Sequence, residues 1–246
     1  MLLLDPLARP IIAHRGDRAH APENTLRAFS LGIDAGADAL ELDVHLSSDG
    51  HVVVCHDATV DRTTNGSGAI EEMPYAALRE LDAGDGQHLP LLSEVLEMFA
   101  RSPLIIDFKV AAVAEPALEL LTRTASRNRV IVGSFGDAPT LLARRVGFAT
   151  TATEAELKRM LPAAVVGRAM KHRGFNAVAM PPTHYRLPLP VSGYVRSSGV
   201  PVHVWTVNDP GRAVKLWRAG VRGIITDDPA IMVAARRTLA PSHSPV

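Results

Sequence analysis

The chain has 246 residues, of which 47% are hydrophobic and 4% are aromatic, and its formal net charge is +0. This composition supports a sizeable apolar core and excludes wholesale disorder. The few aromatic rings and the lack of a basic run argue against a nucleic-acid partner and against docking on an anionic membrane surface. No apolar stretch of the sequence approaches the length of a membrane span.

Cys55 is the single cysteine, so no disulfide can form within the chain. The first residues, Met1 to Pro6, lack a basic start, and their apolar run is too short for a signal peptide. Free thiols are typical of reducing compartments. We therefore expect a cytoplasmic protein, with Cys55 as a small core residue.

The chain opens with a short apolar run at 10–15, which is typical of a buried strand that ends in His14 and Arg15. The residues Pro-Glu-Asn-Thr at 22–25 begin a helical pattern, which Gly36 ends. Asn and Thr satisfy free backbone amides at the start of a helix. We therefore interpret 22–25 as a helix start, with a substrate role for Glu23 as the less favoured alternative.

The stretch 39–57 is predicted to form two strands joined by a Ser-Ser-Asp-Gly turn, with His56 near the end of the second strand. Side chains of a strand alternate between its faces, so Glu41, Asp43 and His45 share one face. Two neighbouring carboxylates on a half-buried strand repel each other and resist desolvation. A hard divalent cation would balance them, because Ca2+ and Mg2+ prefer carboxylate oxygens.

After residue 57, apolar runs with strand character alternate with helical patterns. Further strands are predicted at 104–109, 130–132, 148–152, 177–180, 202–207 and 223–226. Helices are predicted at 74–81, 93–99, 115–126, 138–146, 154–161, 191–198, 210–219 and 229–239. We expect Pro162 to break the helix that begins at residue 154, with the helical pattern resuming to about His172. A proline-rich loop is expected up to Pro190, and a frayed tail after Ala240.

These elements form eight strand-then-helix units with no linker between them. Apolar strands that alternate with helices predict a parallel sheet covered by helices. Eight such units in a chain of this length predict an α/β protein with the TIM (β/α)8 barrel fold. A doubly wound open sheet is the alternative, but no glycine-rich dinucleotide fingerprint follows the first strand. We expect a single domain over 1–246, with its core at about 10–240.

Unusual polar residues occur where the predicted strands end, and in a TIM barrel these ends meet at the rim that carries the active site. The residues are His14 and Arg15, Glu41 and Asp43, Asp107 and Lys109, Ser134, Trp205 and Thr206, and Asp227. Such a set suits a phosphate ester. A divalent cation polarises the ester, cationic side chains hold its oxygens, and histidines move protons.

A series of motifs runs in order along nearly the whole chain: His14-Arg15-Gly16, Pro22 to Thr25, Gly36 to Val44, Asp49 to Asp57, Arg62 to Gly66, Leu89 to Leu92, Trp205 to Asn208, and Gly223 to Pro229. Together these motifs resemble the glycerophosphodiester phosphodiesterase family. The resemblance implies a TIM barrel that hydrolyses glycerophosphodiesters, which are small molecules, to glycerol 3-phosphate and an alcohol.

By this resemblance His14 and His56 would be the general acid and base, and one divalent cation, Mg2+ or Ca2+, would be the cofactor. The implied metal ligands are Glu41, Asp43 and Asp107, of which Asp107 stands where the family usually carries Glu. Arg15 and Lys109 would contact the phosphate. Zinc is disfavoured, because zinc sites usually recruit His or Cys.

Four further residues are interpreted from their positions. Trp205, at the end of a strand, is a candidate to wall a glycerol pocket. Asp57 is expected to orient His56 and to fix its loop. We expect Asp227 to cap the loop before Pro229, and His45 to support the site from beyond the reacting groups.

Two alternative functions stay open at the level of the sequence. The same scaffold can support a lysophospholipase D-type activity, for which the 180–190 loop would provide an apolar entrance. A non-catalytic barrel that binds phosphate or a polyol is the other alternative. The sequence leaves open the alcohol headgroup, the choice between a cyclic-phosphate route and direct attack by water, and the oligomeric state.

Overall fold

The computed structural model describes residues 1–170, 174–182 and 191–239, and within them eight parallel strands run in the order β6-β5-β4-β2-β1-β9-β8-β7. Their bounds are β1 (Ile11–His14), β2 (Ala39–Leu46), β4 (Leu104–Phe108), β5 (Val130–Gly133), β6 (Ala149–Thr150), β7 (Val178–Met180), β8 (Val202–Val204) and β9 (Gly223–Thr226). The two ends of this order also meet, because Thr151 and Ala177 form a parallel bridge and Ala152 N donates to Ala177 O at 2.9 Å. The predicted TIM barrel is confirmed.

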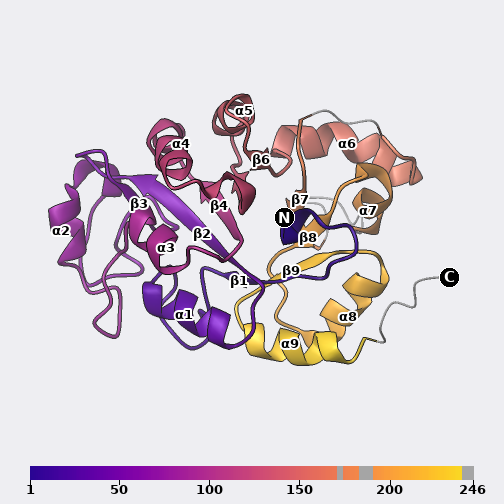
Figure 1. The fold of residues 1–246 in the computed structure, drawn as a ribbon, viewed down its shortest axis with the longest axis horizontal. Helices are drawn as coiled ribbons and strands as arrows, with labels where there is room; N and C mark the ends of the chain where they lie inside the picture. Colours follow the sequence, from indigo (N-terminus) through magenta and orange to yellow (C-terminus); the bar gives the residue numbers. More distant parts are fainter. Residues whose placement is uncertain (171–173, 183–190, 240–246) are drawn as a thin grey trace.

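Helices cover the outside of the strands, as Figure 1 shows. They are α1 (Leu26–Asp34), α2 (Tyr75–Arg79), α3 (Leu92–Met98), α4 (Ala114–Arg123), α5 (Asp137–Arg145), α6 (Glu154–Val166), α7 (Ser192–Ser198), α8 (Pro210–Arg218) and α9 (Pro229–Arg237). No helix among the described residues is long and apolar enough to cross a membrane.

The strand period of two divides each strand between a helix-facing side and a barrel-facing side. On β2, Leu40, Leu42 and Val44 are fully buried in the layer between the sheet and the helices. Burying a side chain of this size stabilises the fold by roughly 1.5–3 kcal/mol. This alternation commits the intervening residues, Glu41 and Asp43, to the interior of the barrel.

Apolar side chains fill the amino-terminal end of the barrel interior. They come from alternate positions of the strands and are Ile12, Ala39, Ile105, Ile131, Ala177 and Ile225. Leu3, on the short 3-10 helix η1 (Leu2–Leu4), is fully buried against them and closes this end. The polar residues of the predicted site therefore lie at the opposite, carboxyl-terminal end.

The second strand continues into the predicted hairpin. β2 pairs in antiparallel fashion with β3 (Val52–Val54), and Val44 lies opposite Val54. Cys55, which follows β3, is 2% exposed and belongs to a small apolar cluster with Val53 and Val60. The hairpin and the core position of Cys55 are thus confirmed.

The prediction that Pro162 breaks a helix is wrong, because α6 runs through Pro162 without interruption. Proline lacks one backbone donor, but Leu157, Met160 and Ala164 pack this helix against the barrel and outweigh that loss. The helix ends instead at Gly167, whose φ of 64° is in the left-handed region. The predicted continuation to His172, the proline-rich loop at 183–190 and the tail after Ala240 lie outside the described residues.

His203 is a fully buried histidine at the closed end of the barrel. Its Nε2 donates to the carbonyl oxygen of Leu3 at 2.9 Å, and its Nδ1 has no hydrogen-bond partner among the described residues. Burial disfavours the charged imidazolium and lowers the pKa of His203 to about 4.

We predict that His203 makes the fold sensitive to mild acid. The unfolded chain takes up this proton near pH 6.5 and the folded chain only near 4, so stability is lost as the pH falls through that window. At pH 5 the loss amounts to about 2 kcal/mol. Urea unfolding at pH 7.5 and pH 5 measures it. The variant His203→Gln should show a smaller difference between the two pH values, and an equal difference would contradict the prediction.

Candidate active site

The carboxyl-terminal end of the barrel brings the polar residues of several strands to one level. On β1 and β2, His14 lies beside Glu41, and Asp43 lies beside Asp107 of β4. All four occupy inward positions, above the apolar layer that contains Ile12. Register and period two thus place them around one opening.

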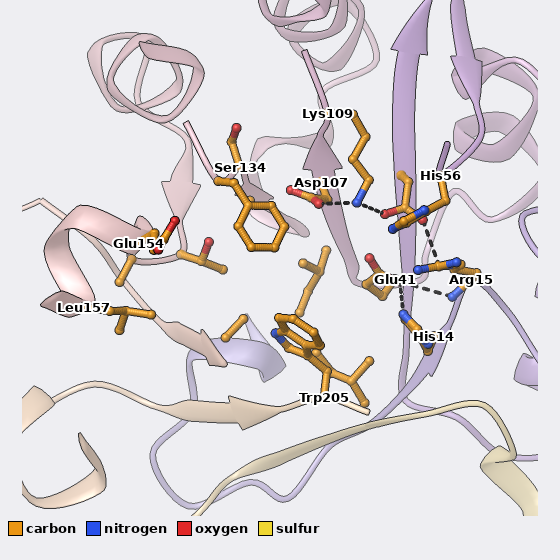
Figure 2. A pocket seen from close by; sticks show the side chains of 18 residues that line it. His14, Arg15, Glu41, His56, Asp107, Lys109, Ser134, Glu154, Leu157 and Trp205 are labelled. Atoms are coloured by element: carbon orange, nitrogen blue, oxygen red, sulfur yellow. Dashed lines mark hydrogen bonds and ion pairs between the residues drawn. The ribbon is translucent and has the colours of Figure 1, made fainter. Parts of the chain in front are cut away.

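This opening is a pocket with about 740 Å³ of space not filled by protein atoms, part of which is open solvent. Figure 2 shows His14, Arg15, Glu41, His56 and Lys109 on one side of it and Ser134, Glu154 and Leu157 on the other, with Trp205 between them. All eight residues of the predicted site line the pocket: His14, Arg15, Glu41, Asp43, His56, Asp107, Lys109 and Trp205. Their roles stay predictions.

Lys109 links two of the three carboxylates. Its Nζ lies 2.7 Å from Asp43 Oδ1 and 2.7 Å from Asp107 Oδ2. Burial opposes the charge on this ammonium, but the charges of Asp107 and Asp43 outweigh burial and raise the pKa of Lys109 to about 12. Arg15 adds a second cation, with Nε 3.2 Å from Asp43 Oδ2. Asp43 is therefore the best compensated of the three.

Glu41 is compensated least. Among the described residues its one ion-pair contact is with His14 Nε2 at 4.0 Å, and its Oε2 also accepts a hydrogen bond from the backbone N of Arg15. Burial and then the charge of Asp43 raise the pKa of Glu41 well above its usual value. An additional positive charge beside this carboxylate would reverse that effect.

The three carboxylates fit a hard divalent cation by their chemistry, because all donors are oxygens. Within the described ranges, no group of three or more His, Cys, Asp or Glu side chains is arranged as a ready metal site. Instead, the ammonium of Lys109 lies between Asp43 and Asp107. A cation that bound these oxygens would replace part of the compensation that Lys109 provides.

His14 is oriented by a carboxylate from the far end of the chain. Its Nδ1 lies 2.7 Å from Asp227 Oδ1, and Asn208 Nδ2 donates to the other oxygen of Asp227 at 2.8 Å. The expectation that Asp227 caps the loop is wrong. Asp228 does so, by accepting from the backbone N of Ile231 at the start of α9, and this leaves Asp227 to face the site.

His56 has an equivalent arrangement. Its Nδ1 lies 2.6 Å from Asp57 Oδ1, and Arg62 Nε donates to Asp57 Oδ2 at 2.6 Å. His45 is buried and donates from Nε2 to the backbone oxygen of His56 at 3.1 Å. The orienting contact of Asp57 and the supporting position of His45 are confirmed. In both catalytic candidates, Nδ1 is engaged and Nε2 is left for the pocket.

Sequence reasoning missed several contributors. Asn24 Nδ2 donates to Asp43 Oδ2 at 3.0 Å, so the segment 22–25 supports the site as well as the helix start. Phe135 lines the pocket and makes an edge-to-face contact with Trp205, with ring centroids 6.5 Å apart. The position of Phe135 directly after Ser134 at a strand end was the available signal.

Fold and site together define a class: a (β/α)8 barrel whose rim combines three carboxylates, two carboxylate-oriented histidines and two cationic side chains. The family model described as the glycerophosphoryl diester phosphodiesterase family matches residues 14–231. The chain belongs to this family.

Relatives agree with this assignment. The chain is 31% identical over 247 aligned residues to the glycerophosphodiester phosphodiesterase of Caldanaerobacter subterraneus subsp. tengcongensis, with 91% of this chain and 96% of the relative covered. It is 28% identical to the Bacillus subtilis glycerophosphodiester phosphodiesterase, with 92% of this chain and 86% of the relative covered.

Solved structures share the fold. The glycerophosphodiester phosphodiesterase of Agrobacterium tumefaciens superimposes with a TM-score of 0.76 at 28% identity, covering 93% of this chain and 99% of that one. An Oleispira antarctica phosphodiesterase, solved with the product sn-glycerol-3-phosphate, gives a TM-score of 0.78 at 25% identity and covers 94% and 98% of the two chains.

The turn after β1 directs Arg15 back over the site. Arg15 has a φ of 58° and Gly16 a φ of 83°, both in the left-handed region. A Cβ on Gly16 would lie 2.5 Å from the carbonyl carbon of Ala28 in α1. Only glycine combines this backbone with so close an approach.

We predict that Gly16→Ala lowers the free energy of unfolding by about 2–4 kcal/mol, because strain and steric overlap add. Gly50→Ala is the matched control: its φ is also 83°, but nothing lies within 4 Å of its Cβ position. This control should lose only about 1 kcal/mol. Urea unfolding of both variants gives the comparison, and equal losses would contradict a role for the contact with Ala28.

Proposed function

We propose that the protein hydrolyses glycerophosphodiesters to glycerol 3-phosphate and an alcohol, with one divalent cation, Mg2+ or Ca2+, as cofactor. The observation that carries the proposal is the meeting of two oriented histidines, His14 and His56, with three carboxylates and two cationic side chains around one pocket. Family membership supports the reaction class, and the Oleispira relative with its bound product supports the same substrate class.

In this proposal Glu41, Asp43 and Asp107 hold the cation. When bound, the cation would polarise a phosphoryl oxygen and favour the ionised form of an attacking hydroxyl. The raised pKa of Glu41 supports a place for added positive charge at this carboxylate. Asp107 is shorter than the Glu usual in the family, and its register position beside Asp43 keeps it at the same rim.

Arg15 and Lys109 are proposed to hold the phosphate oxygens. Both cations face the pocket from the carboxylate side, so a substrate phosphate can approach them directly. A guanidinium offers paired donors that suit phosphate, and an ammonium acts as a compact charge. Trp205 is proposed to line the part of the pocket that holds the glycerol of the substrate, with Phe135 beside it.

His14 and His56 are proposed as the general acid and base. One Nε2 takes the proton from the attacking hydroxyl, and the other Nε2 gives a proton to the oxygen of the departing alcohol. Asp227 and Asp57 accept from Nδ1 in each ring, which fixes the tautomer and favours the imidazolium when it forms. A cytoplasmic location stays a prediction from the sequence.

We predict that glycerol 3-phosphate release from glycerophosphocholine and glycerophosphoethanolamine stops with EDTA and returns with Mg2+ or Ca2+. The same ion should raise the Tm of the protein, since a ligand that binds only the folded state stabilises it. Glu41→Gln should lose that rise, whereas Glu71→Gln, at an exposed position, should keep it. Turnover that persists in EDTA would contradict metal dependence, and faster turnover of a lysolipid would favour the lysophospholipase D alternative.

We predict that Asp227→Asn lowers kcat about 10- to 100-fold, because the amide cannot balance the imidazolium of His14. Asp228→Asn is the control, since asparagine also caps a helix start and the Asp228 carboxylate accepts from the backbone N of Ile231, whereas Asp227 contacts His14. Steady-state kinetics on the metal-loaded protein gives both values. An unchanged kcat in Asp227→Asn would remove His14 from the proposed proton transfer.

A further inference from the structure

Glu23 is an acidic residue whose side chain is not used by the helix that it precedes. Thr25 is the N-cap of α1 and accepts from the backbone N of Ala28 at 3.2 Å. The side chain of Glu23 is only 10% exposed and faces guanidinium groups instead. Burying a carboxylate costs free energy unless other groups compensate its charge, and the helix amides do not do so for Glu23.

Three arginines surround the carboxylate of Glu23. Arg18 makes the longest contact, with Nη2 3.7 Å from Oε2, and the other two form hydrogen bonds. Arg15 Nη1 donates to Oε1 at 2.8 Å. Arg62 binds both oxygens, with Nη2 2.7 Å from Oε1 and Nη1 3.1 Å from Oε2. Burial alone would raise the pKa of Glu23, but the contacts with Arg62 and Arg15 outweigh burial and lower it to about 2. Glu23 is therefore ionised at neutral pH and lies beside three arginine cations.

Arg62 extends this contact to a catalytic candidate. Its Nε donates to Asp57 Oδ2 at 2.6 Å, while its Nη1 and Nη2 remain on Glu23. Asp57 in turn orients His56 through Nδ1. One planar guanidinium thus spans two carboxylates, which a lysine ammonium at position 62 could not do with the same geometry.

Glu23 also contributes to the phosphate side of the site. Arg15 is held between Glu23 on Nη1 and Asp43 near its Nε. Without the carboxylate of Glu23, the guanidinium groups of Arg15 and Arg62 would lose their shared counter-charge. Each would then lose an anchor that fixes its position beside the pocket.

We propose that Glu23 is a positioning residue that holds Arg15 for the substrate phosphate and, through Arg62 and Asp57, holds His56 for proton transfer. This inference rests on the proposed function for its kinetic consequences. The contacts themselves come from two segments of the rim: the connection between β1 and α1, which carries Arg15 and Glu23, and the loop after β3, which carries Asp57 and Arg62. Glu23 therefore couples substrate binding and proton transfer through one carboxylate.

Glu23→Gln tests the proposal, because glutamine keeps the shape and removes the charge. We expect kcat/KM to fall about 10- to 100-fold, with a lower kcat through His56 and a higher KM through Arg15. In an Asp57→Asn background the connection to His56 is already broken. There, Glu23→Gln should lower kcat by less than about 3-fold while still raising KM, because residues of one network are not additive.

Glu156→Gln is the matched control. Glu156 forms a similar two-point ion pair with Arg144, at 2.7 and 2.8 Å, but it lies on α6 and does not line the pocket. This control should lose stability and keep the kcat and KM of the parent protein. If Glu156→Gln shows the same kinetic losses as Glu23→Gln, the effect is general destabilisation and the proposal fails.

A second variant and an NMR measurement test the proposal independently of the kinetics of Glu23→Gln. If Glu23→Gln does not fold, Arg62→Lys replaces it and should lower kcat with little change in KM. Histidine side-chain NMR of the same proteins reads the tautomer of His56 without turnover. We expect a fixed Nδ1–H form in the parent and a mixture of tautomers in Glu23→Gln.

The outcomes separate the two claims. A parent protein inactive with every divalent cation contradicts the proposed function, and the NMR spectrum then decides the role of Glu23 alone. If the parent protein is active, any one of three results contradicts the role of Glu23. These are unchanged kcat and KM in Glu23→Gln, kcat losses of Glu23→Gln and Asp57→Asn that multiply fully in the double variant, and an unchanged His56 tautomer in Glu23→Gln.

Discussion

The charge balance among three carboxylates at the barrel mouth, two of them buried and one partly buried, is the constraint on which the site depends. Glu41, Asp43 and Asp107 occupy inward positions of neighbouring strands, and their apolar neighbours along each strand are committed to the helix layer. Water cannot solvate carboxylates in such a place as it does at a surface, so positive charge must be supplied locally. Lys109 and Arg15 supply part of it and are also the groups best placed to meet a substrate phosphate.

Carboxylates also hold the two histidines in place. Each ring is held at Nδ1 by an aspartate, and each aspartate is held by a further donor, Asn208 for Asp227 and Arg62 for Asp57. These layers of contact restrict the rings to one orientation. A rim built from loops thereby gains the precision that proton transfer requires. The candidate metal ligands and the histidines thus belong to one polar network, which lies above the apolar layer of the barrel interior.

Much of this could be predicted because strand and helix periods are local properties. The alternation around Glu41 and Asp43 correctly placed both on one face, and eight strand-then-helix units correctly gave the barrel. The predicted break at Pro162 failed for a physical reason. Local backbone preference favours a break there, but packing of α6 against the barrel outweighs the loss of one hydrogen bond.

The sequence by itself determined the fold class, the rim and the types of side chain gathered there, since apolar periodicity dictates which residues face the core. Only the tertiary structure decided which groups pair. His14 and Asp227 are 213 positions apart, and Glu23 and Arg62 are 39 apart. Spacing along a chain cannot specify such contacts, because they depend on where the barrel closure and the loop conformations carry each side chain. Thr151, which follows β6, forms a parallel bridge with Ala177, which precedes β7. This bridge completes the closure of the barrel and so fixes the geometry of the site.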